Sequence, residues 1–201
     1  MPAFVRKTFV FQVFVIPSGS MLNTLRKDDR AAVDKFSPRL GGTPKRGEVV
    51  VFRDPGGWLD EAPGGGGVLG GVQTALSWVG LAPSANGKDL IKRVFAVAGD
   101  TVDCRAGHPL TVDGTARDEP HRHPGATPCD DYPVGAVTVP PGHLRVMGDH
   151  RNDSADSRYR QLHDPGGGSV PTGNVVGRAR LVPWPLSRWD PPVPAAFRAI
   201  G

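Results

Sequence analysis

The sequence predicts a mainly β protein, built as a barrel or sandwich of short antiparallel strands. Runs of β-branched and aromatic residues recur along the chain, and glycine, proline and aspartate separate them at brief intervals. A chain of 201 residues is long enough to bury a core of its own. We therefore expect one elaborated domain that spans residues 1–201.

The N-terminal strands are predicted at residues 8–17, 31–36 and 46–53. In the first of them, Phe9, Val13 and Val15 alternate with Val10, Phe14 and Ile16, so both faces are largely apolar and the strand should be buried. β-branched residues dominate the other two, and a Pro/Gly turn precedes the third.

Residues 54–88 are rich in glycine and proline and are expected to form a long insertion. Val72, Leu76 and Val79 lie at helical spacing within it and predict a short amphipathic helix. That helix either covers an edge of the core or contacts a membrane surface through Trp78.

The C-terminal half continues with short strands. They are predicted at residues 89–94, 101–103, 110–112, 137–139, 144–147 and 175–182. A turn at Gly99-Asp100 separates the first two, and a proline-rich extended tail is expected over residues 185–201.

The charge pattern argues against nucleic-acid binding. The formal net charge is +4, but lysine and arginine are scattered among acidic residues and form no basic helix or aromatic-interleaved stripe. A mildly basic surface suits anionic lipid headgroups. No stretch approaches the ~20 apolar residues that cross a bilayer.

Two cysteines, Cys104 and Cys129, are either two reduced thiols or one disulfide, and their spacing alone leaves both open. A zinc site that joins them to His121 and His123 lacks the tight ligand spacing of such sites. We expect neither a metal nor a cofactor.

A serine and a distant lysine carry the candidate chemistry. Ser20 lies in Pro17-Ser18-Gly19-Ser20-Met21, and Lys92 lies in a predicted strand where alternation puts it on the face opposite Ile91 and Arg93. A serine hydroxyl needs a base before it attacks a carbonyl, and a desolvated neutral lysine can be that base. The pair indicates a Ser–Lys hydrolase.

Three motifs in this order resemble those of bacterial type I signal peptidases, in particular the actinobacterial branch. They are Ser18-Gly19-Ser20-Met21, then Lys92-Arg93 ahead of Gly99-Asp100, and then a box at residues 148–158 that reads GDHRNDSADSR. The resemblance covers about residues 9–184. It implies a signal-peptidase-like β fold and a serine endopeptidase that removes signal peptides after an Ala-x-Ala site.

The resemblance also implies a role for each matching residue. Ser20 is the nucleophile and Lys92 the general base, and Ser18 shares the oxyanion hole with the backbone N–H of Ser20. Ser154 is expected to hydrogen-bond the Lys92 amine. The supporting charge network consists of Asp149, Arg93, Asp156 and Arg158.

The family binds the extended segment before the cut as an added strand, with shallow pockets for small side chains. The positions that match its substrate-binding residues are Phe14, Ile16, Pro17, Met21, Leu25, Asp89, Leu90 and Ile91. Further implications are signal peptides and a phospholipid surface as partners, and a place on the extracytoplasmic face of the cell membrane. The family carries a membrane anchor upstream of the first motif, and we expect this chain to lack it.

Asn23 departs from the family pattern, which has proline at this position. If the asparagine only loosens the turn, proline here would stabilise the protein through the unfolded state.

Three alternatives compete with this interpretation. A Ser–His–Asp triad through His143 or His150 lacks a nucleophile elbow around Ser20. A self-cleaving repressor protease needs a DNA-binding helix-turn-helix, for which no room is expected before residue 8. An inactive peptide-binding β module of the same fold conflicts with the intact Ser20, Lys92 and Ser154.

Overall fold

A computed structural model describes residues 11–36, 41–59, 89–164 and 166–186. Two antiparallel sheets make up most of this part of the chain. The larger has the strand order β1-β2-β11-β3-β4-β9-β10 and the smaller the order β7-β6-β5-β8. The predicted mainly β class is therefore confirmed, although β1 and β10 do not pair within the described residues and the larger sheet stays open.

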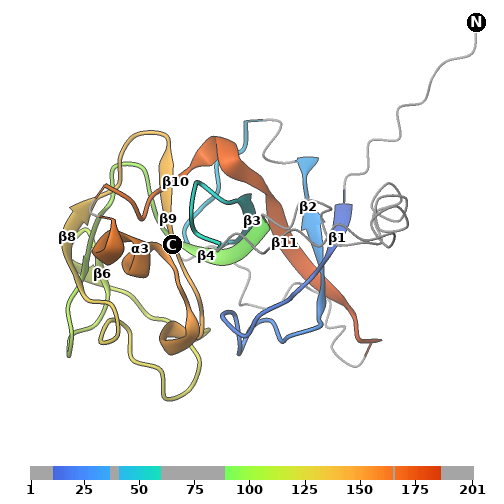
Figure 1. Cartoon of the computed structure of the whole chain (residues 1–201), viewed down its shortest axis with the longest axis horizontal. Helices are drawn as coiled ribbons and strands as arrows, with labels where there is room; N and C mark the ends of the chain where they lie inside the picture. The colour runs from blue at the N-terminus through green and yellow to red at the C-terminus, as the bar shows by residue number, and fades with distance from the viewer. Residues whose placement is uncertain (1–10, 37–40, 60–88, 165, 187–201) are drawn as a thin grey trace, which may run out of the picture.

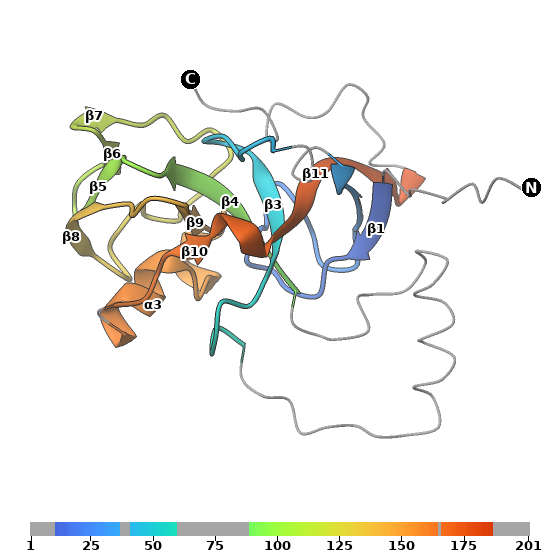
Figure 2. The same ribbon diagram turned by 90° about the horizontal axis from the view of Figure 1, so that it is seen from above.

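The larger sheet consists of β1 (Phe11–Val15), β2 (Arg30–Asp34), β11 (Val175–Trp184), β3 (Val49–Arg53), β4 (Asp89–Val97), β9 (His143–Met147) and β10 (Val170–Pro171). The smaller sheet consists of β7 (Thr115–Ala116), β6 (Thr111–Val112), β5 (Thr101–Cys104) and β8 (Val134–Thr138). Figures 1 and 2 show the smaller sheet and α3 (Ser157–His163) at one end of the molecule and β1 and β2 at the other.

The central strand β3 is buried on both faces, because its first four residues are all apolar and all buried. Val49 and Val51 pack in the core cluster that also contains Phe14. Val50 and Phe52 point the other way and pack in a second cluster. The alternation follows from the two-residue period of a strand and leaves no solvent-facing side in the middle of the sheet.

Strands occur at every predicted position that the structure describes, with shifted ends. β4 extends to Val97 rather than stopping at residue 94, and β8 begins at Val134 rather than 137. The short strands β7 and β10 were not predicted. The first three residues of the predicted strand 8–17, the predicted helix around residues 72–79 and most of the predicted tail lie outside the described residues.

Helix α3 was also missed, because its first residues belong to the third motif. Asp156 caps the helix, and its side chain accepts a hydrogen bond from the Arg158 N–H. An aspartate at this position is a favourable N-cap. Asp156 thus ends the loop formed by the first part of the third motif and begins helix α3.

The open question about the cysteines is resolved in favour of a disulfide. Cys104 and Cys129 are bonded with their Cα atoms 5.3 Å apart, and both are fully buried. A bridge with a sequence separation of 25 stabilises by about 3 kcal/mol through loop closure. With both sulfurs bonded to each other, neither is available as a thiolate ligand for zinc.

Over the described residues, none of the helices has the length and apolar character needed to cross a bilayer.

Candidate active site

Ser20 lies in a tight loop that leaves the end of β1 and returns to β2. Its base is closed by Ile16 N–H, which donates to the Asp29 carbonyl at 2.9 Å, and by Asp28 N–H, which donates to the Ile16 carbonyl at 2.9 Å. Within the loop, Leu22 N–H donates to the Gly19 carbonyl at 2.9 Å. Ser20 itself is only 5% exposed. The loop therefore holds a serine hydroxyl inside the protein rather than in solvent.

Lys92 lies in the interior of β4 and is 5% exposed. Its register opposite Val50, with Ile91 opposite Val51, follows the predicted alternation of faces. The Lys92 Nζ hydrogen-bonds to Ser20 Oγ. The two residues predicted to form the reactive pair, 72 positions apart in the sequence, are thus in contact.

Burial lowers the pKa of Lys92 to about 8, because the interior penalises the ammonium ion. The carboxylates of Asp156, Asp153 and Asp149 act in the opposite direction and keep the pKa from falling further. At pH 7 about one lysine in ten is then neutral, which is enough for Lys92 to serve as a base.

Ser18 lies on the same side of the loop as the reactive hydroxyl. Its Oγ is 3.3 Å from Ser20 Oγ, and its side chain lines the groove described below. The hydroxyl predicted to donate to an oxyanion is therefore next to the atom that would attack.

Arg93 and Asp149 form a buried ion pair beside the dyad. The guanidinium donates to both carboxylate oxygens, at 2.8 and 2.6 Å, and Asp149 has no exposed surface. Thr24, four residues after Ser20, hydrogen-bonds to both partners. We call residues 16–29, the loop between β1 and β2 that contains Ser20, the nucleophile loop. The ion pair connects this loop to β4 and to the residues that follow β9.

Asp156 and Arg158 form a second buried pair. Arg158 donates to both oxygens of Asp156, at 3.1 and 2.9 Å, and the Gly148 N–H donates to the same carboxylate at 3.1 Å. Burial by itself raises the pKa of Asp156, but Arg158 and the Gly148 N–H outweigh it, so the pKa lies below 3.8. Asp156 stays ionised and fixes the turn after β9.

The predicted hydrogen bond between Ser154 and Lys92 is not formed. Within the part of the chain that the structure describes, the buried Ser154 Oγ has no hydrogen-bond partner. Ser154 packs against Gly148, where an added Cβ would lie 2.4 Å from its Oγ. Lys92 is instead bonded to Ser20, so the expected orienting role of Ser154 has no contact to support it in this structure.

A groove of about 140 Å³ adjoins the dyad. A buried cavity of similar size holds one benzene molecule, so the groove has room for small side chains. The predicted residues that line it are Phe14, Ile16, Pro17, Asp89, Leu90 and Ile91. It is also lined by Val15, Val51 and Leu59, which sequence reasoning missed.

Met21 and Leu25 were predicted to line this groove and do not. Both are fully buried in the core cluster that contains Phe14 and Ile16. Leu25 N–H donates to the Met21 carbonyl at 2.8 Å, so the chain turns here and carries both side chains into the core. They support the loop from within.

The expectation that Asn23 merely loosens the turn is wrong. Its φ is +93°, a left-handed value that proline, fixed near −65°, cannot adopt. Its side-chain amide also donates to the carbonyls of His121 and Arg122, at 3.0 and 3.2 Å. Asparagine is one of the few residues that tolerates such a φ.

We therefore expect Asn23→Pro to lower the free energy of unfolding by more than about 1 kcal/mol, since the native φ is incompatible with proline. Urea denaturation followed by fluorescence measures this. Asn23→Gly is the control. Because glycine accepts the same φ, its free energy of unfolding should fall by less than that of the proline variant. A proline variant at least as stable as the parent would show that the loop adopts the family's conformation instead.

The histidines do not form a triad with Ser20. His143 Nδ1 is bonded to the Pro141 carbonyl at 2.9 Å, and His150 reaches Ser20 only through its backbone N–H, which donates to the Ser20 carbonyl at 3.1 Å. His121 is a buried neighbour that sequence reasoning did not place here. Burial together with Arg93 lowers its pKa to about 4, so it is neutral at pH 7.

Comparison with known proteins gives a consistent result. Residues 1–184 match the family model described as signal peptidase, peptidase S26. The chain is 43% identical to signal peptidase I of Mycobacterium tuberculosis, with 92% of this chain and 69% of that protein covered. It is 42% identical to the probable signal peptidase I of Mycobacterium leprae, over 92% of this chain and 73% of the relative.

Among solved structures, signal peptidase I of Enterococcus faecalis aligns with a TM-score of 0.41 and 22% identity, covering 67% of this chain and 95% of that one. The family match over most of the chain and the identity to the mycobacterial proteins decide the assignment. The chain belongs to the signal peptidase family, peptidase S26, and is a serine peptidase of its actinobacterial-like branch.

Proposed function

We propose that this protein removes N-terminal signal peptides from secreted preproteins, with Ser20 as nucleophile and Lys92 as general base. The observation that carries the proposal is the hydrogen bond between a buried Lys92 amine and the Ser20 hydroxyl. Nucleophile and base within hydrogen-bond reach are what acyl transfer by a serine requires.

In the first half of the reaction, neutral Lys92 takes the proton of the Ser20 hydroxyl while Ser20 Oγ bonds to the scissile carbonyl carbon. The carbonyl oxygen becomes an oxyanion, which the Ser18 hydroxyl and the Ser20 N–H stabilise; one such donor contributes about 2.7–4 kcal/mol. The Lys92 ammonium then protonates the departing amine. The mature protein leaves, and the signal peptide remains as an ester of Ser20.

In the second half, Lys92 is neutral again and takes a proton from water. The resulting hydroxide attacks the ester carbonyl, and Ser20 Oγ recovers a proton from the Lys92 ammonium. One peptide bond and one water are consumed, and the enzyme returns to its starting state.

The substrate is proposed to bind as an extended strand along the groove. Pairing of β4 with β9 begins at Arg93, so residues 89–92 pair only with β3 among the described strands. Their other backbone edge adjoins the groove and can receive a peptide by β-augmentation.

Small residues are expected at the first and third positions before the cut, because Ile16, Leu90 and Ile91 narrow the groove. Replacing either Ala of a substrate peptide with Trp should lower kcat/KM by at least about 10²-fold, since an oversized side chain enters only if packed strands move. Competition between matched Ala and Trp peptides in one reaction measures the ratio. Equal cleavage of the two would mean that substrate binds elsewhere.

A surface for anionic phospholipid is proposed next to the nucleophile loop. Trp184 and Leu186, at and just beyond the end of β11, are 49% and 60% exposed. The Arg30 guanidinium lies 6.0 Å from the centre of the Trp184 ring. Arg26 and Lys27 of the nucleophile loop are also exposed. An exposed tryptophan and leucine beside cations suit a headgroup layer on the extracytoplasmic face of the cell membrane.

The alternatives have less support. For the self-cleaving repressor protease, the relatives named above are signal peptidases rather than repressors. An inactive peptide-binding module would not need a lysine of lowered pKa hydrogen-bonded to a buried serine, as Lys92 is to Ser20.

The deciding experiment is incubation of the protein with a preprotein in detergent or lipid, followed by mass spectrometry of the new N-terminus. A single cut after an Ala-x-Ala site supports the proposal. Binding of the preprotein without any cut would favour the inactive module.

A further inference from the structure

Residues 119–129 form an irregular segment between β7 and β8 that contains none of the motifs, and we call it the clamp segment. Glu119, at its start, pairs with the buried Arg151. Cys129, at its end, is bonded to Cys104 of β5. Both ends are thus fixed, one to the residues that follow β9 and one to the smaller sheet.

The clamp segment holds the nucleophile loop through Asn23. The Asn23 amide donates to two successive carbonyls of the segment, His121 at 3.0 Å and Arg122 at 3.2 Å. Asn23, three residues after Ser20, makes these contacts from a left-handed backbone conformation with φ of +93°. This link is specific to the asparagine, since a proline or an apolar side chain has no group that donates here.

The clamp segment also holds the residues after β9 through His123. The His123 N–H donates to the Asp149 carbonyl at 2.9 Å, and its ring packs on the His150 ring with the centroids 4.3 Å apart. The next backbone N–H, that of His150, donates to the Ser20 carbonyl at 3.1 Å. Ser20, His150, His123 and Asn23 therefore close a circuit of contacts around the nucleophile.

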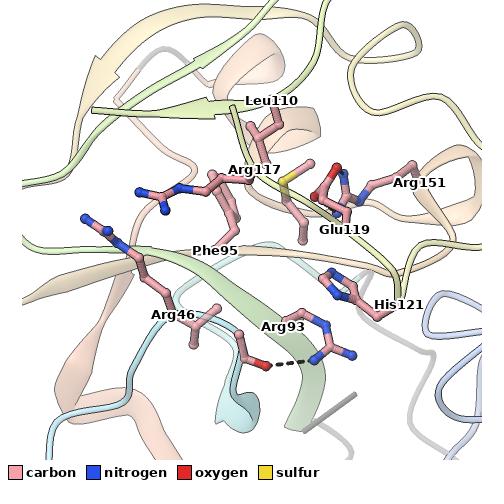
Figure 3. Close-up of a pocket in the computed structure, with 11 residues that line it drawn as sticks. Arg46, Arg93, Phe95, Leu110, Arg117, Glu119, His121 and Arg151 are labelled. Atoms are coloured by element: carbon pink, nitrogen blue, oxygen red, sulfur yellow. Dashed lines mark hydrogen bonds and ion pairs between the residues drawn. The ribbon is translucent and has the colours of Figure 1, made fainter. Parts of the chain in front are cut away.

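The far side of the segment is braced by buried arginines. The Pro128 carbonyl accepts from Arg158 at 3.0 Å and from Arg151 at 3.5 Å. Figure 3 shows Glu119 beside Arg151, with His121 of the same segment close to Arg93 of β4. The segment is consequently anchored to rigid parts of the structure on three sides.

We propose that the clamp segment sets the position of Ser20 relative to Lys92, and that Asn23 and His123 are its positioning residues. Lys92 is fixed by the ladder of β4, whereas Ser20 is in a loop and needs support from outside it. A displacement of about 1 Å between reacting groups costs on the order of 10²-fold in rate. The inference rests on the proposed function only in that cleavage is its main readout.

The test compares Asn23→Gly and His123→Ala with the parent and with Asp113→Gly. Asn23→Gly keeps the left-handed φ and removes only the amide. Asp113 is the matched control, since it too has a positive φ, +54°, and its side chain bridges two segments, Thr101 and Arg46, at the turn between β6 and β7.

We expect both clamp variants to lower kcat by about 10-fold to 10²-fold with KM within about twofold, because the groove is untouched. The amide hydrogen of His150 should exchange faster in both, since its bond to the Ser20 carbonyl loosens. Asp113→Gly should lower the melting temperature by about as much as the two clamp variants do. It should leave kcat and the exchange rate of the His150 amide at parental values.

Parental kcat in Asn23→Gly and His123→Ala, at a temperature where both are folded, would overturn the inference. So would a loss of kcat in Asp113→Gly as large as in the clamp variants, because general destabilisation would then account for all three. If the parent protein cuts no preprotein, the proposed function fails instead, and the exchange rate of the His150 amide still tests the clamp by itself.

Discussion

Ser20→Ala and Lys92→Met are each expected to abolish cleavage of a preprotein, lowering kcat by at least about 10⁴-fold, and to leave the protein folded. Ser20→Ala removes the atom that bonds to the carbonyl carbon. Lys92→Met keeps an unbranched apolar stem of similar length and removes only the amine that takes the proton. Because Lys92 is buried, with a pKa of about 8, losing its charge relieves a desolvation cost, and the melting temperature should not fall.

Single-turnover cleavage of a preprotein, measured by gel and mass spectrometry with circular dichroism on the same samples, checks both variants. Lys45→Met, an exposed lysine away from the groove, is the control and should cleave at the parental rate. Turnover near the parental rate in either dyad variant would mean that another group supplies the nucleophile or the base.

Asp156→Asn is expected to lower the free energy of unfolding by about 3–5 kcal/mol, the usual cost of removing one partner from a buried ion pair. The variant leaves Arg158, which has no exposed surface, without its charged partner. Arg105→Ala is the matched control, because Arg105 pairs with Asp103 at the surface and such pairs contribute about 0–1 kcal/mol. Urea denaturation gives both values.

The pH dependence of stability provides a second readout for Asp156. Its pKa in the folded protein lies below 3.8, so its contribution is fully present above that unfolded value and is lost as the pH falls through the folded pKa. The parent should lose this stability in acid, and Asp156→Asn should show a smaller loss over the same range. Equal losses in the two proteins would mean that the Asp156 charge is not what stabilises the turn.

Features that depend on neighbouring residues could be predicted from the sequence. The two-residue period located the strands, and three short motifs identified Ser20, Lys92 and the two buried ion pairs. The strand predictions succeeded because strand alternation is written in neighbouring residues. The motif residues are in contact in the structure, and their catalytic roles stay predictions.

Contacts that depend on the tertiary fold were not predictable in the same way. The spacing of Cys104 and Cys129 is compatible with a disulfide or with two thiols, and only the packing of β5 against the clamp segment brings the sulfurs together. Met21 and Leu25 have the same apolar character as the groove residues, but a turn carries them into the core. Asn23 was misjudged because its φ and its two acceptors, 98 and 99 residues away, leave no trace in the local sequence.

The most direct measurement of the central claim is the pH dependence of kcat/KM for the parent protein on a signal-peptide substrate. Only neutral Lys92 accepts the Ser20 proton, so the rate should rise with pH and level off above an apparent pKa of about 8. A rise centred near pH ~6.5 that disappears in His143→Ala or His150→Ala would instead assign the base to a histidine and contradict the Ser20–Lys92 dyad.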